Sequence, residues 1–188
     1  IGVITRALEM RDPYTAGHQR GVASLARAMA RVLGFTETAQ TGIEMAALVH
    51  DVGKIAVPAD ILAKPTRLTP IEFAIVKDHP ATGYEILRRV TFPWPVAEVI
   101  VQHHERLDGS GYPAGLKGDE IRKEARILGL ADVVEAMLSH RPYRAALSVD
   151  VVLAEIRQNR GVLYDPEAVD ACVALFLEDG YTLDYGAS

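Results

Sequence analysis

The chain has 188 residues, which is enough for one domain with a buried core. Its formal net charge of −5 excludes a broadly basic surface, and with it a protein that coats DNA or RNA. The single cysteine, Cys172, excludes an internal disulfide and favours the reducing cytoplasm, and no apolar run approaches the roughly 18 residues that a membrane span needs.

Helical periodicity dominates the first part of the chain. Ile1–Met10 reads as a first helix. Thr15 is placed to cap a second helix, which carries an apolar stripe from His18 to Val32 and which Gly34 closes. Thr36 opens a third helix, whose apolar stripe runs to His50 before a loop begins.

The rest of the chain also predicts helices, separated by one long loop. Thr69 followed by proline starts a helix in the favoured cap-then-proline order, and its apolar face, with Phe73 and Ile75, leads to His79 one helical turn after Ile75. Further helices are predicted at Pro80–Val90 and Val96–His104, followed by the glycine-rich loop Glu105–Glu120. The last helices are predicted at Ala125–Leu138, Ser148–Arg160 and Pro166–Glu178.

These elements predict an all-α fold, a helical bundle that residues 1–188 form as a single domain. No internal repeat, low-complexity segment or linker divides the sequence. Because the sequence starts at Ile1 without a methionine, we expect it to be a fragment of a longer chain with a sensor or receiver domain upstream.

Polar residues on the apolar faces of these helices are the informative feature. Taken singly, an inward histidine is usually a hydrogen-bonded core residue, and an inward aspartate usually has a cationic partner or caps a helix. Here five histidines and two aspartates from five helices point into one bundle, which can gather them into a central site. Nitrogen and oxygen ligands without thiolate favour iron, manganese or a similar metal over a structural zinc. The set consists of His18, His50, Asp51, His79, His103, His104 and Asp132.

Two divalent cations in such a site would suit phosphate chemistry. Their charge exceeds that of two aspartates and a bridging hydroxide, so the centre would stay weakly positive and attract a phosphate. Paired metals also lower the pKa of bound water and hold both the attacking and the leaving oxygen. We therefore expect a metal-dependent phosphohydrolase, in which removal of Asp51 abolishes metal binding and activity together.

Four segments carry a resemblance to a known family: Arg11–His18 (RDPYTAGH), His50–Lys54 (HDVGK), His103–Pro113 (HHERLDGSGYP) and Arg141–Arg144 (RPYR). They resemble the HD-GYP family of bacterial phosphodiesterases, a branch of the HD metal-dependent phosphohydrolases, and the order and spacing agree over nearly the whole chain. The resemblance implies an HD-domain-type helical bundle with a central metal site. It also implies cytoplasmic hydrolysis of the second messenger cyclic di-GMP to linear pGpG, with further cleavage to GMP left open.

The resemblance further implies a role for each polar residue of the cluster. Asp51 and Lys54 would be the catalytic residues, with Asp51 bridging two metals. Lys54 would contact the scissile phosphate or help the leaving oxygen, the alternative being a solvated loop lysine. The ligands would be His18, His50, Asp51 and Asp132 for one metal and, with Asp51 as the bridge, His79, His103 and His104 for the other.

Substrate contacts are expected from the signature loop and from two arginines. Asp108, Gly111 and Tyr112 belong to the loop, whose glycines permit close backbone approach. Tyr112 would either contact the substrate or pack the loop onto the bundle. Arg141 and Arg144 would bind phosphate or guanine through their planar side chains, or else pair with nearby acids.

Three positions depart from the family's pattern. Some members carry a glutamate four residues before the first histidine, where it helps to hold a third metal. Here that residue is Tyr14, so a dinuclear centre is expected. Glu135 stands where an aspartate is expected, and His140 where an aspartate is common. The last two changes are either neutral or alter the pocket and its recognition of guanine.

Three functions stay open on the sequence alone. The leading one is cyclic di-GMP hydrolysis. The second is hydrolysis of another cyclic dinucleotide such as cyclic GMP-AMP. The third is a binding module that signals through partner proteins, for instance through the Gly-Tyr-Pro loop, with weak turnover or none. A homodimer is also open, and the ligand types do not decide between iron and manganese.

Overall fold

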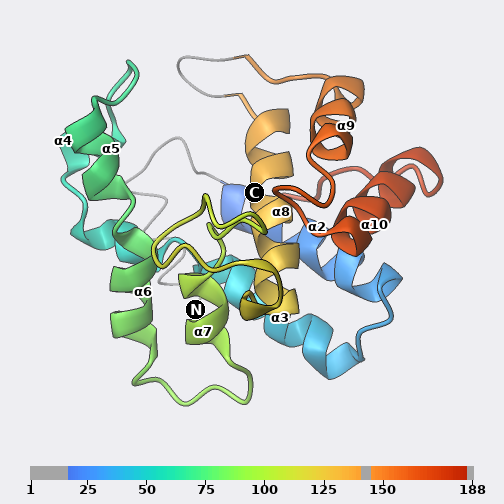
Figure 1. Cartoon of the computed structure of the whole chain (residues 1–188), viewed down its shortest axis with the longest axis horizontal. Helices are drawn as coiled ribbons and strands as arrows, with labels where there is room; N and C mark the ends of the chain where they lie inside the picture. Colours follow the sequence, from blue (N-terminus) through green and yellow to red (C-terminus); the bar gives the residue numbers. More distant parts are fainter. Residues whose placement is uncertain (1–16, 141–144, 186–188) are drawn as a thin grey trace.

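The computed structural model describes residues 17–140 and 145–185, and within these ranges the chain is helical, which confirms the predicted all-α fold (Figure 1). No helix in these ranges combines the length and the apolar character that crossing a membrane requires. The α-helices are α2 (His18–Val32), α3 (Glu37–Val49), α4 (Ala59–Leu62), α5 (Pro70–Val76), α6 (His79–Leu87), α7 (Val96–Val101), α8 (Lys123–Leu138), α9 (Val149–Gln158) and α10 (Pro166–Leu177), and the 3-10 helices are η2 (Val52–Ala56) and η3 (Gly118–Glu120).

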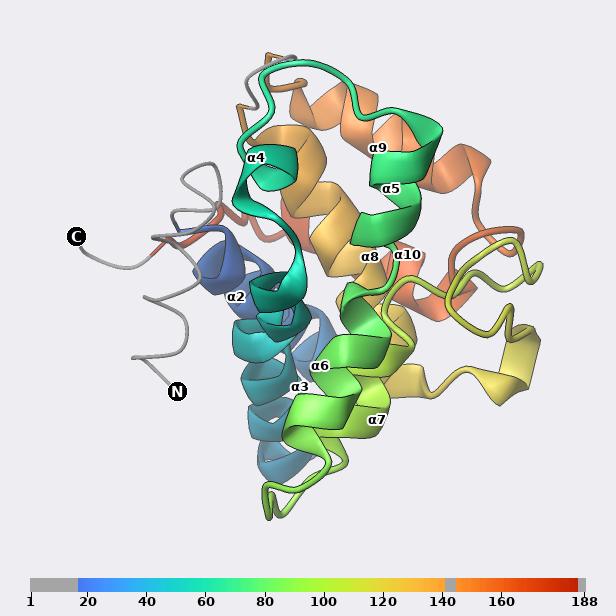
Figure 2. The ribbon, with the colours of Figure 1, turned by 90° about the vertical axis from the view of Figure 1, so that its left-hand side faces the viewer.

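Helices α2, α3 and α8 form the middle of the bundle. α2 packs against both α3 and α8, and α10 contacts α2, α8 and α9 on one side. On the other side α6 packs against α7 and η2, and α7 packs against α3 and α8 (Figures 1 and 2). The core side chains between them include Leu25, Met29, Ile43, Ile100, Leu128, Leu130, Ile156 and Leu175, all fully buried.

Local capping explains several of the helix boundaries. As predicted, Thr36 begins α3 by accepting a hydrogen bond from the Ala39 amide, and Thr69 begins α5 in a capping box with Glu72. Gly34 follows α2 with a φ of 75°, a left-handed conformation that glycine adopts without steric cost. These starts and stops are local in origin, which is why the sequence predicts them.

Several predicted boundaries differ from the observed ones. α2 begins at His18 behind a left-handed Gly17, and the cap predicted at Thr15 lies outside the described residues. α7 ends at Val101 and does not reach His104, because the backbone hydrogen bonds there tighten to a three-residue spacing. The loop expected after α3 contains two short helices, η2 and α4.

Helices α4 and α5 form an arm at the edge of the molecule (Figure 1). Neither helix contains a buried residue. The apolar face predicted for the second of them is wrong, since Phe73 and Ile75 are 45% and 41% exposed. The arm ends directly before His79, so it connects two parts of the site described next without belonging to the core.

Candidate metal centre

The seven predicted ligands are gathered at one place by helix ends. His18 is the first residue of α2, and His79 is the first residue of α6. The other histidines lie in the turns that end α3 and α7, where the chain reverses direction. Asp132 differs because it projects from the middle of α8. A helix end can point a side chain inward without placing the rest of its helix in the core.

Three of the histidines are oriented by the carbonyl three residues earlier in the chain. His50 Nδ1 lies 2.7 Å from the Ala47 carbonyl, and His79 Nδ1 lies 2.8 Å from the Val76 carbonyl. His103 Nδ1 makes the same contact with Ile100. A carbonyl only accepts, so each Nδ1 carries the proton and each Nε2 presents a lone pair to the centre.

The ligand atoms form two groups. We call His18, His50 and Asp132 the acidic group, and His79, His103 and His104 the histidine group. Within each group the ligand atoms lie within 4.8 Å of one another, the span expected around one ion. This division agrees with the two ligand sets that the family resemblance implies.

Asp51 stands between the two groups. Its Oδ1 lies 3.4 Å from His79 Nε2, whereas its Oδ2 lies 3.6 Å from His50 Nε2. The two oxygens of one buried carboxylate therefore face different groups, the arrangement that a bridging ligand needs. Burial by itself would raise the pKa of Asp51, but Lys54 and the surrounding histidines lower it well below its usual range.

The residues fit a bound cation. His50 Nε2 is buried and has no hydrogen-bond partner among the described residues, although its Nδ1 is satisfied by Ala47. A buried lone pair without a donor is costly, and a metal ion at this position would remove the cost. Nitrogen and oxygen donors that converge without thiolate suit a divalent transition metal.

Burial keeps the histidine group neutral. It lowers the pKa of His79 to about 4 and that of His104 to about 3, and it lowers the pKa of His103 as well. At neutral pH these three side chains therefore carry no proton that a metal would have to displace.

The acidic group behaves differently. Burial would lower the pKa of His18 too, but hydrogen bonds to Asp132 and Glu135 outweigh burial and raise this pKa to about 9. The pKa of Asp132 lies well below its usual range, because His18 and two further histidines offset the cost of burying its charge. Without metal, this group holds a protonated histidine against a carboxylate.

Lys54 lies at the edge of the centre. Its Nζ is 2.7 Å from Asp51 Oδ2, and its side chain is 21% exposed, so it can still be reached from outside. Gly53 makes this position possible, because a Cβ there would lie 1.9 Å from the His79 carbonyl oxygen. Only glycine lets η2 approach the start of α6 so closely, and this contact brings Asp51 and Lys54 beside His79.

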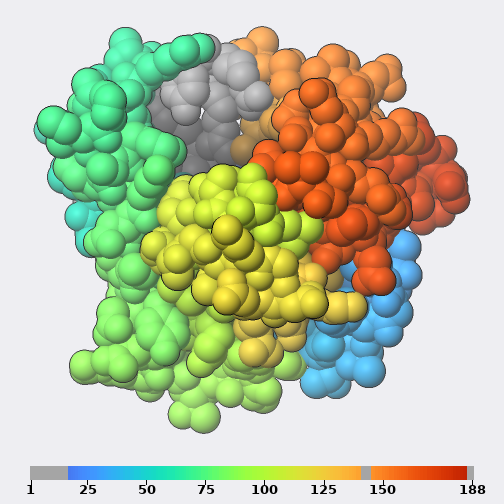
Figure 3. Space-filling model, viewed as in Figure 1, coloured from blue at the N-terminus to red at the C-terminus, as the bar shows by residue number. Residues whose placement is uncertain are grey.

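The signature loop folds back onto the histidine group. The Tyr112 amide donates to the His104 carbonyl at 3.2 Å, and the two rings lie 4.7 Å apart. Gly111 again permits close packing, since a Cβ would lie 2.4 Å from the Cα of Glu105. In Figure 3 the loop forms the middle of the visible face, between the arm and α9. Tyr112 and Gly111 are thus beside the centre, where the sequence places them.

Glu105 is a residue whose role the sequence did not reveal. It is 5% exposed and accepts hydrogen bonds from the amides of Ala114 and Leu116, at 2.7 and 3.0 Å. This carboxylate ties the far side of the loop to the turn that carries the two histidines. Glu105 directly follows the histidine pair and begins the loop, and this position is the signal in the sequence that could have suggested its role.

Of the remaining residues predicted to contact the substrate, the structure describes only Asp108. Asp108 is exposed and accepts a hydrogen bond from the Ser110 amide at 2.9 Å, so the structure shows it shaping a turn. Arg141, Arg144 and Tyr14 lie outside the described residues. Their assignments, including the dinuclear stoichiometry that depends on Tyr14, stay predictions.

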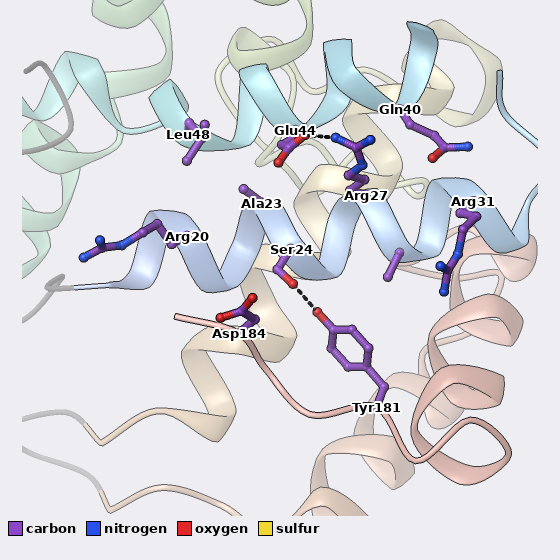
Figure 4. Close-up of a pocket in the computed structure, with 11 residues that line it drawn as sticks. Arg20, Ala23, Ser24, Arg27, Arg31, Gln40, Glu44, Leu48, Tyr181 and Asp184 are labelled. Atoms are coloured by element: carbon purple, nitrogen blue, oxygen red, sulfur yellow. Dashed lines mark hydrogen bonds and ion pairs between the residues drawn. The ribbon is translucent and has the colours of Figure 1, made fainter. Parts of the chain in front are cut away.

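A separate groove of about 420 Å³ lies between α2, α3 and the C-terminal segment (Figure 4). None of the seven ligands lines it. Its central cation, Arg27, pairs with Glu44 and with Glu37, the latter at 2.6 Å, and Ser24 bonds to Tyr181 at 2.7 Å. The charge of Arg27 is therefore matched by acids, and two further arginines, Arg20 and Arg31, also line the groove.

Comparison with known proteins identifies the family of this chain. Residues 2–168 match the HD domain family. The cyclic di-GMP phosphodiesterase response regulator RpfG of Xanthomonas campestris is 45% identical over 89% of this chain, and the chain spans 45% of that protein's length.

Two solved structures share the fold. An HDG"Y"P protein of Bdellovibrio bacteriovorus superposes with a TM-score of 0.71 at 20% identity, over 85% of this chain and 51% of its own. A cyclic GMP-AMP specific phosphodiesterase of Vibrio cholerae superposes with a TM-score of 0.59 at 33% identity, over 95% of this chain and 41% of its own. The chain belongs to the HD domain family, and its motifs and relatives place it in the HD-GYP branch.

Proposed function

We propose that this chain is the catalytic domain of a phosphodiesterase that hydrolyses cyclic di-GMP to linear pGpG. The observation that carries the proposal is Asp51, whose two oxygens face the two ligand groups while Lys54 pairs with one of them. A relative with 45% identity carries the name of a cyclic di-GMP phosphodiesterase, which supports the substrate class.

Two divalent cations, iron or manganese, would be held by the acidic and histidine groups with Asp51 shared between them. Bound there, they would neutralise charge on a phosphate and lower the pKa of a coordinated water. Two ions are proposed because the ligand atoms of the acidic group and those of the histidine group each converge within 4.8 Å, and a third set, His50, Asp51 and His103, links the two groups.

The chain's own residues then bind and orient the diester. Lys54 is charged, partly exposed and held at the centre by Asp51, so it can donate a hydrogen bond to a phosphate oxygen or a proton to the leaving oxygen. Tyr112 offers a ring face beside His104 for stacking against a base. Burial raises the pKa of Tyr112, so its hydroxyl stays a hydrogen-bond donor.

A second substrate has specific support. The cyclic GMP-AMP specific phosphodiesterase that shares the fold is 33% identical over nearly the whole chain. Metals at this centre would act on the phosphate that both substrates contain, so they would not distinguish the bases. Substrate choice would come from residues around the loop and from Arg141 and Arg144, whose predicted contacts remain to be tested.

The decisive experiment loads the purified protein anaerobically with Fe(II) or Mn(II) and follows cyclic di-GMP, cyclic GMP-AMP and pGpG by chromatography. We expect turnover of cyclic di-GMP to pGpG. Lys54→Met should lower kcat by about 10²- to 10⁴-fold while metal content is kept. Lys64→Met is the matched control, because Lys64 pairs with Glu72 on the arm and should leave kcat unchanged.

Each contrary result has a distinct meaning. Faster turnover of cyclic GMP-AMP would reassign the substrate within the same chemistry. Tight binding without turnover, with either metal, would identify a binding module. An upstream sensor or receiver domain, signalling partners at the loop, a homodimer and a cytoplasmic location stay predictions, the first supported by the response-regulator name of the relative.

A further inference from the structure

His18 differs from the other buried ligands in how its outer nitrogen is held. His50, His79 and His103 each use a carbonyl three residues earlier in the chain. His18 is instead the first residue of α2 and follows a left-handed Gly17. Its Nδ1 contacts a side-chain oxygen of Glu135, 117 residues away in the sequence.

Glu135 is buried, and both of its carboxylate oxygens have partners. It is 1% exposed, and its second oxygen accepts a hydrogen bond from the Ser139 hydroxyl at 2.6 Å. A buried carboxylate is costly unless its oxygens are satisfied, and here each of them has a defined partner. The rotamer of Glu135 is therefore fixed from one side by Ser139 and from the other by His18.

The contact decides which nitrogen His18 presents to the centre. With Nδ1 against Glu135, His18 Nε2 faces Asp132 Oδ1 at 3.2 Å and Asp51 Oδ2 at 4.0 Å. Glu135 and Asp132 are three residues apart on α8 and so share one face of that helix. Both ring nitrogens of His18 therefore contact residues of α8: Nδ1 contacts Glu135, and Nε2 lies beside Asp132.

Glu135 itself is unsuited to be a ligand. Its oxygens do not belong to any of the converging sets of possible ligand atoms among the described residues, and they lie on the Nδ1 side of the ring, away from Asp132. The carboxylate can act on a metal only through His18.

We propose that Glu135 is a positioning residue for the acidic group, which fixes the His18 ring with Nε2 toward the metal and strengthens His18 as a ligand. Accepting the Nδ1 proton increases electron density on Nε2 and holds one tautomer. The inference rests on the proposed metal centre and is independent of which cyclic dinucleotide is cleaved.

The test measures metal affinity and not only activity. Glu135→Leu and the isosteric Glu135→Gln are titrated with Mn(II) against a chelator, and metal content is counted after desalting. Loss of an outer partner of this kind typically costs about 10- to 100-fold in affinity, which we expect for the leucine variant at one of the two metals, with a smaller loss for glutamine. The EPR signal of the Mn(II) pair should change in both variants.

Arg126→Gln is the matched control. Arg126 lies on the same helix, but it bonds to Asp119 and Asp165, neither of which is a ligand. This variant should lower the thermal stability of the metal-free protein without changing either metal affinity.

Wild-type affinity for both metals in Glu135→Leu, or in Glu135→Gln if the leucine variant does not fold, would overturn the inference while the proposed function stands. A wild-type protein that takes up no metal would overturn the proposed centre and this inference with it.

Discussion

The acidic group and the histidine group are built from the same kind of ligand, yet their charges differ. Burial drives the proton off the histidine group, where the pKa values of His79 and His104 fall to about 4 and 3. In the acidic group Asp132 and Glu135 hold a proton on His18, whose pKa rises to about 9. Burial alone leaves a buried histidine neutral, whereas the carboxylates beside His18 outweigh burial and keep it protonated.

This difference has consequences for metal loading. The acidic group contains the carboxylate of Asp132 and has the Glu135 charge behind His18. It should therefore bind a divalent cation more strongly than the histidine group does once the pH is high enough to remove the His18 proton. The histidine group is neutral and needs no deprotonation, so its affinity should depend little on pH. Asp51 lies between the two groups, with one carboxylate oxygen facing each of them.

The largest effect should come from breaking both groups at once. Asp51→Ala removes the carboxylate whose oxygens face each group, so we expect both metals to be lost and kcat to fall by at least about 1,000-fold. Metal analysis and product chromatography on the same sample check this expectation. The exposed Asp60→Ala on the arm is the control and should retain both. Normal turnover by a metal-free Asp51→Ala protein would contradict the bridging role.

Breaking one group at a time should separate the two metals. Asp132→Ala and His79→Ala should each reduce the metal content from about two ions to about one per chain, with Asp132→Ala having the larger effect because it removes a charge. Elemental analysis at saturating Mn(II) measures the change. His140→Ala, at an exposed histidine outside the cluster, should keep the wild-type content. Loss of both ions in both variants would show that the groups do not bind independently.

The smallest expected effect is the difference between the two groups in how their metal affinity depends on pH. A metal must displace the His18 proton, so below pH 9 the affinity of the acidic group should fall by up to about tenfold for each pH unit. The histidine group should show no such dependence until the pH approaches 4, where His79 begins to hold a proton. Calorimetry in buffers of different ionisation enthalpy should report about one proton released at pH 7, in one binding step. Proton release in both steps, or in neither, would refute the difference between the groups.

The sequence predicts the positions of the polar cluster well, although one of its reasons is wrong. The periodicity argument placed His79 inward because it follows Ile75 by one helical turn. Ile75 is 41% exposed, whereas His79 is 2% exposed, because His79 starts α6 and does not continue α5. Val32, on the stripe predicted with His18, is likewise 44% exposed at the end of α2. Periodicity is a poor guide near helix ends, where the direction of the chain changes.

The sequence by itself determined the all-α class, the caps at Thr36 and Thr69, the stop at Gly34 and the motifs of the HD-GYP branch. These features depend on residues within a few positions of one another, so local spacing encodes them. Only the tertiary structure showed that the ligand atoms converge, that the two oxygens of Asp51 face different groups, and that Glu135 holds His18. Each of these depends on contacts between residues far apart in the chain, such as the 117 positions that separate His18 from Glu135, and on the burial that sets their charge.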